Sequence, residues 1–204
     1  MILVARSASA EELQQASTAG VEIKTQPVAL DAFVFIANHE NAVQSLTVAQ
    51  IQQVYTGQLT SWNQVGGPDQ ALNAYQRDAD SGSQVLMKQL VMKEKQMIDA
   101  PDMVLMGMMG PINRISEDTW GLGYSVYFFE QFMAPNDKLK LLGIDGVVPS
   151  SETIGQRSYS LATEVYAAVR ADLDPQSSAR KLHDWLLTAQ GQAVVAESGY
   201  VRAR

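Results

Sequence analysis

The chain contains no cysteine, only two histidines and no long apolar segment. The absence of cysteine excludes disulfide bonds, thiolate catalysis and cysteine-based zinc sites. The longest apolar runs are Ala32–Ala37 and Met103–Met109. Both are much shorter than the roughly 20 residues that a membrane-spanning helix needs, so the sequence predicts no direct membrane span.

Positive charge is also scarce, because 15 Lys and Arg face 22 Asp and Glu, a net charge of −7. Nucleic acid is therefore not an expected partner, since affinity for it rests mainly on neutralised phosphates. A local cationic pocket for a small anion remains compatible with this balance. The content of 46% hydrophobic and 18% charged residues is that of a globular protein of 204 residues.

The start of the chain does not have the pattern of a secretory leader. Met1–Val4 is followed by Ala5 and Arg6, with no basic region and too short an apolar stretch. The protein is therefore expected either to be cytoplasmic or to have lost a leader.

Strand-type and helix-type segments alternate along most of the chain. We expect strands at 2–5, 21–25, 28–37, 71–76, 121–128, 139–144 and 158–170. Helices are expected after Ser9, from Thr47, over 83–98, and after Asp174, which we expect to cap the last helical region. Such alternation predicts an α/β fold with a largely parallel sheet.

No arrangement typical of an enzyme is present. His39 lies in a polar turn and His183 in an amphipathic helix, and there is no G-x-S-x-G elbow. Zinc, calcium and nucleotide-phosphate motifs are also missing. The sequence predicts no catalytic residue, no metal site and no cofactor, and an α/β hydrolase or transferase is the weaker alternative.

Methionine is concentrated in one region. Eight of the nine methionines lie between Met87 and Met133. A methionine-rich binding groove is conceivable, but because Met108 and Met109 belong to an apolar run we expect these side chains to fill the core.

The segment Tyr75–Gln84 joins an expected strand to an expected helix. Arg77 offers a two-pronged donor fork that matches an oxyanion. Ser81 and Ser83 carry hydroxyl donors, and Gly82 permits close backbone approach at a helix N-terminus. These features describe an oxyanion cradle; a plain helix cap by Ser81 or Asp80, with Arg77 on the surface, explains them equally well.

At this segment the chain resembles a known family. Its Arg-x-x-x-Ser-Gly-Ser pattern is similar to the R-x-x-x-S-G-T ligand loop of the phosphate-binding proteins of phosphate ABC transporters. Further similarities follow in the family's order, at Asp31–Asn38, Ser45–Gly67, Gly121–Tyr124 and Leu182–Val201.

This resemblance implies a type II periplasmic-binding-protein-like fold, in which two α/β lobes joined by crossing hinge strands close over a ligand. Residues 1–36 and 159–204 would form lobe 1 and residues 37–158 the inserted lobe 2. Crossing strands are expected near Phe33–Asn38 and Ser158–Val165.

The resemblance also implies a function. The protein would be a solute-binding protein, or a fragment of one, that binds a small oxyanion, chiefly phosphate, for ABC-type uptake. Arg77, Ser81, Gly82 and Ser83 would bind the ligand, with Arg6 as a candidate from the other lobe. An ABC transporter permease would be the partner, and the location would be extracytoplasmic. The alternative is a sensing or adhesion module of the same fold within a larger protein.

Two departures from the family pattern are visible. Relative to the family, lobe 1 is expected to lack its opening β–α portion. In addition, the Asp that often stands two residues after the loop arginine is replaced by Ala79, with Asp80 beside it, and Arg6 stands where the family has another Asp. These changes leave sulfate or another oxyanion open as the ligand.

Overall fold

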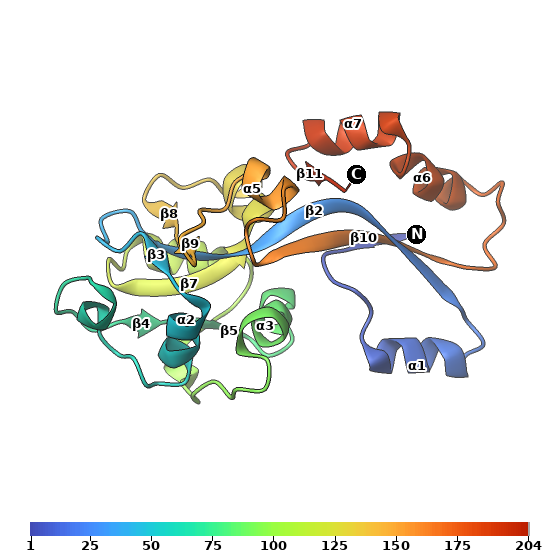
Figure 1. Ribbon diagram of the computed structural model, residues 1–204. Coiled ribbons are helices and arrows are strands. Elements are labelled where there is room, and N and C mark those ends of the chain that lie inside the picture. The colour runs from blue at the N-terminus through green and yellow to red at the C-terminus, as the bar shows by residue number, and fades with distance from the viewer. Residues whose placement is uncertain (204) are drawn as a thin grey trace. The chain divides into compact units, whose positions relative to one another are not determined.

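A computed structural model describes residues 1–203, which form two compact units (Figure 1). Unit 1 contains Met1–Asp31 and the chain from Ala162 onward, and unit 2 contains Ala32–Leu161. The chain passes between the units twice, within strand β2 (Ile23–Asn38) and immediately before strand β10 (Ala162–Arg170). The sequence placed these divisions near residues 36 and 159, and the assignment of the units as ligand-binding lobes stays a proposal.

Unit 1 is built on strands with helices on either side. Strand β10 lies between β1 and β2, and β11 pairs with β2. Figure 1 draws α6 and α7 on one side of these strands and α1 on the other. Besides β2 and β10, its elements are β1 (Ile2–Val4), α1 (Ala10–Thr18), α6 (Ser178–Leu186), α7 (Ala189–Glu197) and β11 (Val201–Arg202).

Unit 2 combines the second part of β2 with short strands and helices. Its strands are β3 (Ser45–Leu46), β4 (Asn73–Ala74), β5 (Gln76–Arg77), β6 (Val104–Leu105), β7 (Gly121–Val126), β8 (Leu139–Leu141) and β9 (Gly143–Ile144). Its α-helices are α2 (Val48–Tyr55), α3 (Gly82–Leu86), α4 (Met109–Ser116) and α5 (Ser151–Gly155). Two 3-10 turns, Trp62–Val65 and Pro101–Met103, and two π-helical turns, Met87–Met92 and Phe129–Met133, complete it.

The expectation of a largely parallel sheet is wrong. Strand β2 pairs antiparallel with β7, β8 and β11, and β1 pairs antiparallel with β10. Parallel pairing joins β3 with β9, β4 with β7, and β5 with β6, over two residues in each case. Alternation along the chain does not reveal strand direction here, because one long strand serves several partners that run against it.

Three element boundaries also differ from the expected ones. The two strands expected over 21–37 are one strand, which continues through Pro27. The helix expected over 83–98 becomes π-helical after Leu86 and ends before Lys93, whose φ is +54°. Ser177 rather than Asp174 caps α6, because the Asp174 carboxylate accepts the backbone N–H of Gln176 in a turn.

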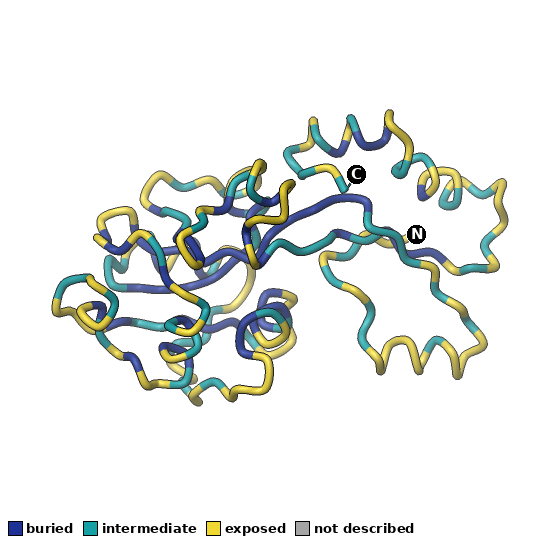
Figure 2. Tube along the Cα trace, viewed as in Figure 1, coloured by how far each residue is buried: buried dark blue, intermediate teal, exposed yellow. Residues whose placement is uncertain are grey.

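The core of unit 2 surrounds the second half of β2. Residues 32–37 of this strand are fully buried, and the rings of Phe33, Phe35, Tyr55 and Tyr124 pack against one another (Figure 2). Val126 to Leu122 of β7 lie opposite Phe33 to Ala37 of β2. This packing fixes Tyr124 in the interior, directly beneath the segment that carries Arg77. No helix of the described residues is both long and apolar enough to cross a membrane.

Candidate functional site

Arg77 is buried in unit 2, with only 5% of its surface exposed. Strand β5 pairs in parallel with β6 and sets Arg77 opposite Leu105. Its Nε donates a hydrogen bond of 3.1 Å to the Leu105 carbonyl. The backbone of two paired strands thus holds a cation inside the unit, where an unpaired charge is costly.

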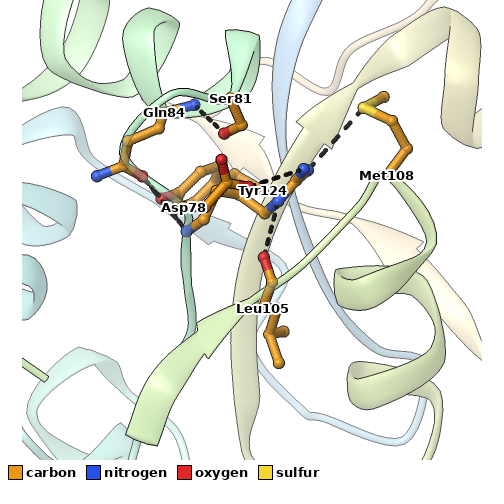
Figure 3. A network of polar contacts seen from close by, with 7 residues as sticks. Asp78, Ser81, Gln84, Leu105, Met108 and Tyr124 are labelled. Atoms are coloured by element: carbon orange, nitrogen blue, oxygen red, sulfur yellow. Dashed lines mark hydrogen bonds and ion pairs between the residues drawn. The ribbon is translucent and has the colours of Figure 1, made fainter. Parts of the chain in front are cut away.

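The remaining donors of the Arg77 guanidinium have weaker partners (Figure 3). Nη1 lies 3.9 Å from the Met108 sulfur, a weak acceptor. Nη2 lies 3.7 Å from Oδ2 of Asp78, which is longer than a hydrogen bond. The two prongs of the fork therefore keep most of their capacity to bind an anion.

Tyr124 and Gln84 fix the backbone of Arg77. The Tyr124 hydroxyl accepts the Arg77 N–H at 2.9 Å and donates to Oε1 of Gln84. That Gln84 oxygen also accepts the Arg77 N–H at 3.3 Å. Burial raises the pKa of Tyr124 well above its ordinary value, so the hydroxyl remains protonated and can donate to Gln84.

Ser81 caps helix α3. Its side chain accepts the Gln84 N–H at 3.1 Å, and its backbone is extended, as expected for a cap. This part of the plain structural alternative is therefore correct, whereas its placement of Arg77 on the surface is wrong. A capping hydroxyl that accepts one hydrogen bond still carries its own proton as a donor.

Gly82 and Ser83 form the first turn of α3. Their N–H groups precede the first intrahelical hydrogen bonds, so they have no partner within the helix. Ser83 is buried, whereas Gly82 is exposed. A Cβ added at Gly82 would meet no atom within 4 Å. There is open space beside this backbone, in which a small ligand would find room.

The junction of β5 and α3 brings several of these groups together. Gln84 links the two elements, because its side chain accepts the Arg77 N–H and its backbone N–H donates to Ser81. Arg77, Ser81, Gly82 and Ser83 all belong to this junction, as the sequence predicted.

Arg6 lies in unit 1 and has another partner. Its guanidinium makes two hydrogen bonds to the Glu12 carboxylate, at 2.8 and 2.9 Å, and a third to the Ser7 carbonyl. The hydrogen bond to Glu12 is the main reason that the pKa of Arg6 is raised. Its fork is therefore occupied by a carboxylate.

Sequence reasoning missed the groups that position Arg77. These are Gln84, Leu105, Met108 and Tyr124. Tyr124 belongs to a stretch that resembles the phosphate-binding family, and Gln84 ends the polar segment, but neither position alone indicates its contact. The core role expected for Met108 and Met109 is wrong, because they are 37% and 44% exposed, although Met87 and Met92 are buried.

Other candidate chemistry is sparse in the described residues. Residues 1–203 hold no group of three or more His, Asp or Glu side chains that could bind a metal ion. His39 is exposed, and buried His183 bonds through Nδ1 to Asp184 at 2.8 Å. Of the charged groups in unit 2, Arg77 best combines burial with unused hydrogen-bonding capacity.

Comparison with known proteins shows the family of this chain. The model of a PBP superfamily domain matches residues 1–190. Among curated proteins, the chain is 24% identical over 202 residues to phosphate-binding protein PstS of Borreliella burgdorferi and 25% identical over 198 residues to that of Staphylococcus epidermidis. These alignments cover 96% and 94% of this chain, but 70% and 60% of the relatives.

Solved structures show the same architecture. An ABC-type phosphate transport receptor from Vibrio cholerae matches with a TM-score of 0.76 and 22% identity, covering 98% of this chain and 78% of that one. PstS from Borrelia burgdorferi matches with a TM-score of 0.69 and 25% identity over the same shares of the two chains. The fold expected from the sequence resemblance is confirmed.

Proposed function

Because this chain belongs to the PBP superfamily, with the type II α/β fold of its phosphate-binding members, we propose that it binds a small oxyanion, phosphate first. Unit 2 supplies the anion loop, formed by Arg77 and residues 81–83. The role is that of a solute-binding protein for ABC-type uptake, without chemical turnover. The chain spans 60% of the length of the Staphylococcus relative. The name of that relative, phosphate-binding protein, describes the longer protein.

The observation that carries this proposal is the incompletely paired guanidinium of Arg77. It is held in a buried position by a hydrogen bond of 3.1 Å to a carbonyl, but its two terminal nitrogens face a thioether and a carboxylate at 3.7 Å. An oxyanion would give those nitrogens two charge-assisted hydrogen bonds, which are roughly twice as strong as neutral ones.

The neighbouring donors suit the same ligand. The N–H groups of Gly82 and Ser83 begin α3, and the hydroxyls of Ser81 and Ser83 lie in the same turn. In this proposal they would donate further hydrogen bonds to the anion, and the open space beside Gly82 leaves room for it. Arg6 of unit 1 stays a further candidate, which would have to leave Glu12 to reach a ligand.

Asp78 favours phosphate over sulfate in this proposal. In the family the resemblance points to, an Asp often stands two residues after the loop arginine, where this chain has Ala79. Here the carboxylate of the preceding residue, Asp78, lies 3.7 Å from Arg77 Nη2. A protonated phosphate can donate its proton to a carboxylate, whereas sulfate at neutral pH has none to donate and is repelled. Asp78→Asn should therefore weaken phosphate binding and improve sulfate binding relative to it.

The partner and the location follow from the family role. We propose that an ABC transporter permease receives the anion and that the protein acts outside the cytoplasm. Both inferences rest on the phosphate-binding relatives of this chain.

Anion-dependent thermal stabilisation tests the proposal. The purified chain is titrated with phosphate, sulfate and chloride at matched ionic strength. A ligand at a hundredfold excess over its Kd stabilises the folded state by about 2.7 kcal/mol. We expect a saturable shift with phosphate and none with chloride. No shift with any of the three anions would contradict the proposal.

Gly82→Ala separates binding from folding. Because a Cβ at this position meets open space and Gly82 begins a helix, the substitution should leave stability unchanged or raise it by about 0.4–1 kcal/mol. The same methyl would occupy the space proposed for the anion. A reduced phosphate response in a protein of undiminished melting temperature is the expected result.

A further inference from the structure

Met108 combines exposure with contact to the buried cation of unit 2. It immediately precedes α4 and is 37% exposed, while its sulfur lies 3.9 Å from Nη1 of Arg77 (Figure 3). A thioether is a weak acceptor, so in this state the contact leaves the Nη1 hydrogens available. Because more than a third of the residue's surface is exposed, a small oxidant can approach the side chain.

We propose that Met108 is an oxidation site that controls whether Arg77 can bind an anion. This inference rests on the proposed function and adds a regulatory chemistry to the same site. Hydrogen peroxide is the oxidant: the sulfur attacks one peroxide oxygen, the O–O bond breaks, and an S–O bond forms. The sulfide loses two electrons to become a sulfoxide, and the remaining oxygen leaves as water.

The sulfoxide changes what Arg77 faces. Its oxygen is a strong hydrogen-bond acceptor, and with the sulfur 3.9 Å from Nη1, an S–O bond turned towards Arg77 would bring that oxygen within hydrogen-bond distance of the nitrogen. A guanidinium N–H that points at this oxygen is no longer free for a ligand. Oxidised Met108 would thus compete, from within the chain, with the oxyanion for the same donor. Methionine sulfoxide reductases reverse the reaction, so the change is reversible.

The other exposed methionines of unit 2 provide an internal control. Met106 and Met133 are 71% and 64% exposed, more than Met108. Within the described residues, the structure gives neither a contact with Arg77. They should oxidise at least as readily, but without effect on the anion site. Met133, in the π-helical turn over Phe129–Met133, is the better control because it is remote in sequence from the loop that holds Met108.

The experiment compares the wild-type chain with Met108→Leu and Met133→Leu, each before and after treatment with hydrogen peroxide. Calorimetric titration with phosphate gives the ratio of Kd values, and peptide mass spectrometry gives the sulfoxide at each methionine. We expect oxidation to weaken binding by about tenfold to a hundredfold in the wild type and in Met133→Leu, corresponding to one lost charge-assisted hydrogen bond. The ratio should stay near one in Met108→Leu.

Met108→Gln provides a second test without an oxidant, because its amide oxygen is a permanent acceptor near Nη1. It should bind phosphate more weakly than Met108→Leu. Equal losses in all three oxidised proteins, or undiminished binding with Met108 fully converted to sulfoxide, would overturn the inference alone. A wild-type chain that binds no phosphate before oxidation would instead overturn the proposed function.

Discussion

The two units of the molecule differ in how much they bury. The largest fully buried side chains, among them Trp62, Tyr55, Tyr124 and Phe35, all lie in unit 2. Unit 1 has a smaller aliphatic cluster, formed by Val28, Ala29, Val165, Ala167 and Val195. Its helix α1 has no buried residue at all (Figure 2).

A hollow in unit 1 also shows that this unit is less well packed. It has a volume of about 360 Å³ and lies beside α1, lined by Leu13, Ala16, Ser17, Gly20, Val21, Glu22 and Ile23. Leu13 remains 48% exposed, so the apolar side of α1 is only partly covered.

The contrast indicates which unit can hold a ligand site on its own. A binding site needs groups whose positions are set by packing and by supporting hydrogen bonds. Arg77 has both, because it stands on paired strands above the ring cluster and its backbone is bonded to Tyr124. Arg6, in unit 1, is held by two exposed partners that are close in sequence, the Ser7 carbonyl and the Glu12 carboxylate.

Truncation of a core ring should give the largest effect. Phe35 is fully buried between Phe33, Tyr55 and Tyr124, so Phe35→Ala should cost about 3–5 kcal/mol in unfolding free energy. Val195→Ala in unit 1 should cost only about 2 kcal/mol, because two methyl groups leave a smaller cavity. Hydrogen exchange resolved by residue would measure both. Equal losses would contradict the difference in packing.

Removal of the Tyr124 hydroxyl should have an intermediate effect. Tyr124→Phe leaves the ring in the core but deprives the Arg77 N–H and the Gln84 side chain of a partner. We expect a loss of about 1–3 kcal/mol in urea unfolding, together with weaker phosphate binding. Tyr159→Phe is the matched control, because the Tyr159 hydroxyl donates to the Phe33 carbonyl and does not contact Arg77. If both variants lost phosphate affinity equally, Tyr124 would have no special role in the site.

Acid should have the smallest effect, and it should act on unit 1. The Arg6 guanidinium, followed by the Ser9 N–H, lowers the pKa of the Glu12 carboxyl from 4.5 to about 2. A lowered pKa in the folded state means that this stabilisation is present above pH 4.5 and is lost as the pH falls towards 2. Because Glu12 is exposed and Arg6 is only partly buried, the effect on global stability should be slight.

An NMR titration of the Glu12 carboxyl in the intact chain would measure this directly. In Arg6→Gln its pKa should rise towards the ordinary value, because the main cause of the shift is gone. A Glu12 that already titrates near 4.5 in the wild-type chain would show that the ion pair does not persist in solution.

Local features of the fold could be predicted from the sequence. Helices begin after Ser9 and Thr47 as expected, and the structure shows a capping box at each, which depends on residues three positions apart. The helix start at Ser81–Ser83 was also predictable, since Ser81 is a typical capping residue. These signals lie within a few residues of the groups they describe.

Features that depend on distant segments could not be predicted. The antiparallel partners of β2 are separated from it by many residues, so a segment-by-segment reading cannot give their direction. The burial of Arg77 depends on Leu105 and Tyr124, which come from β6 and β7. The exposure of Met108 could not be predicted either, because an apolar run does not reveal which of its residues pack against other segments.

The most direct test of the account is the binding of phosphate to the wild-type chain, Arg77→Lys and Arg114→Lys, measured by equilibrium dialysis with labelled phosphate. Arg114 is a fair control, because it is an exposed arginine of unit 2 whose Nε donates to the Tyr75 hydroxyl at 2.6 Å. Lysine keeps the charge but loses the two-pronged fork. We predict one phosphate per chain for the wild type and Arg114→Lys, and a loss of affinity of roughly a hundredfold for Arg77→Lys. Unchanged binding by a folded Arg77→Lys would contradict the assignment of the anion site.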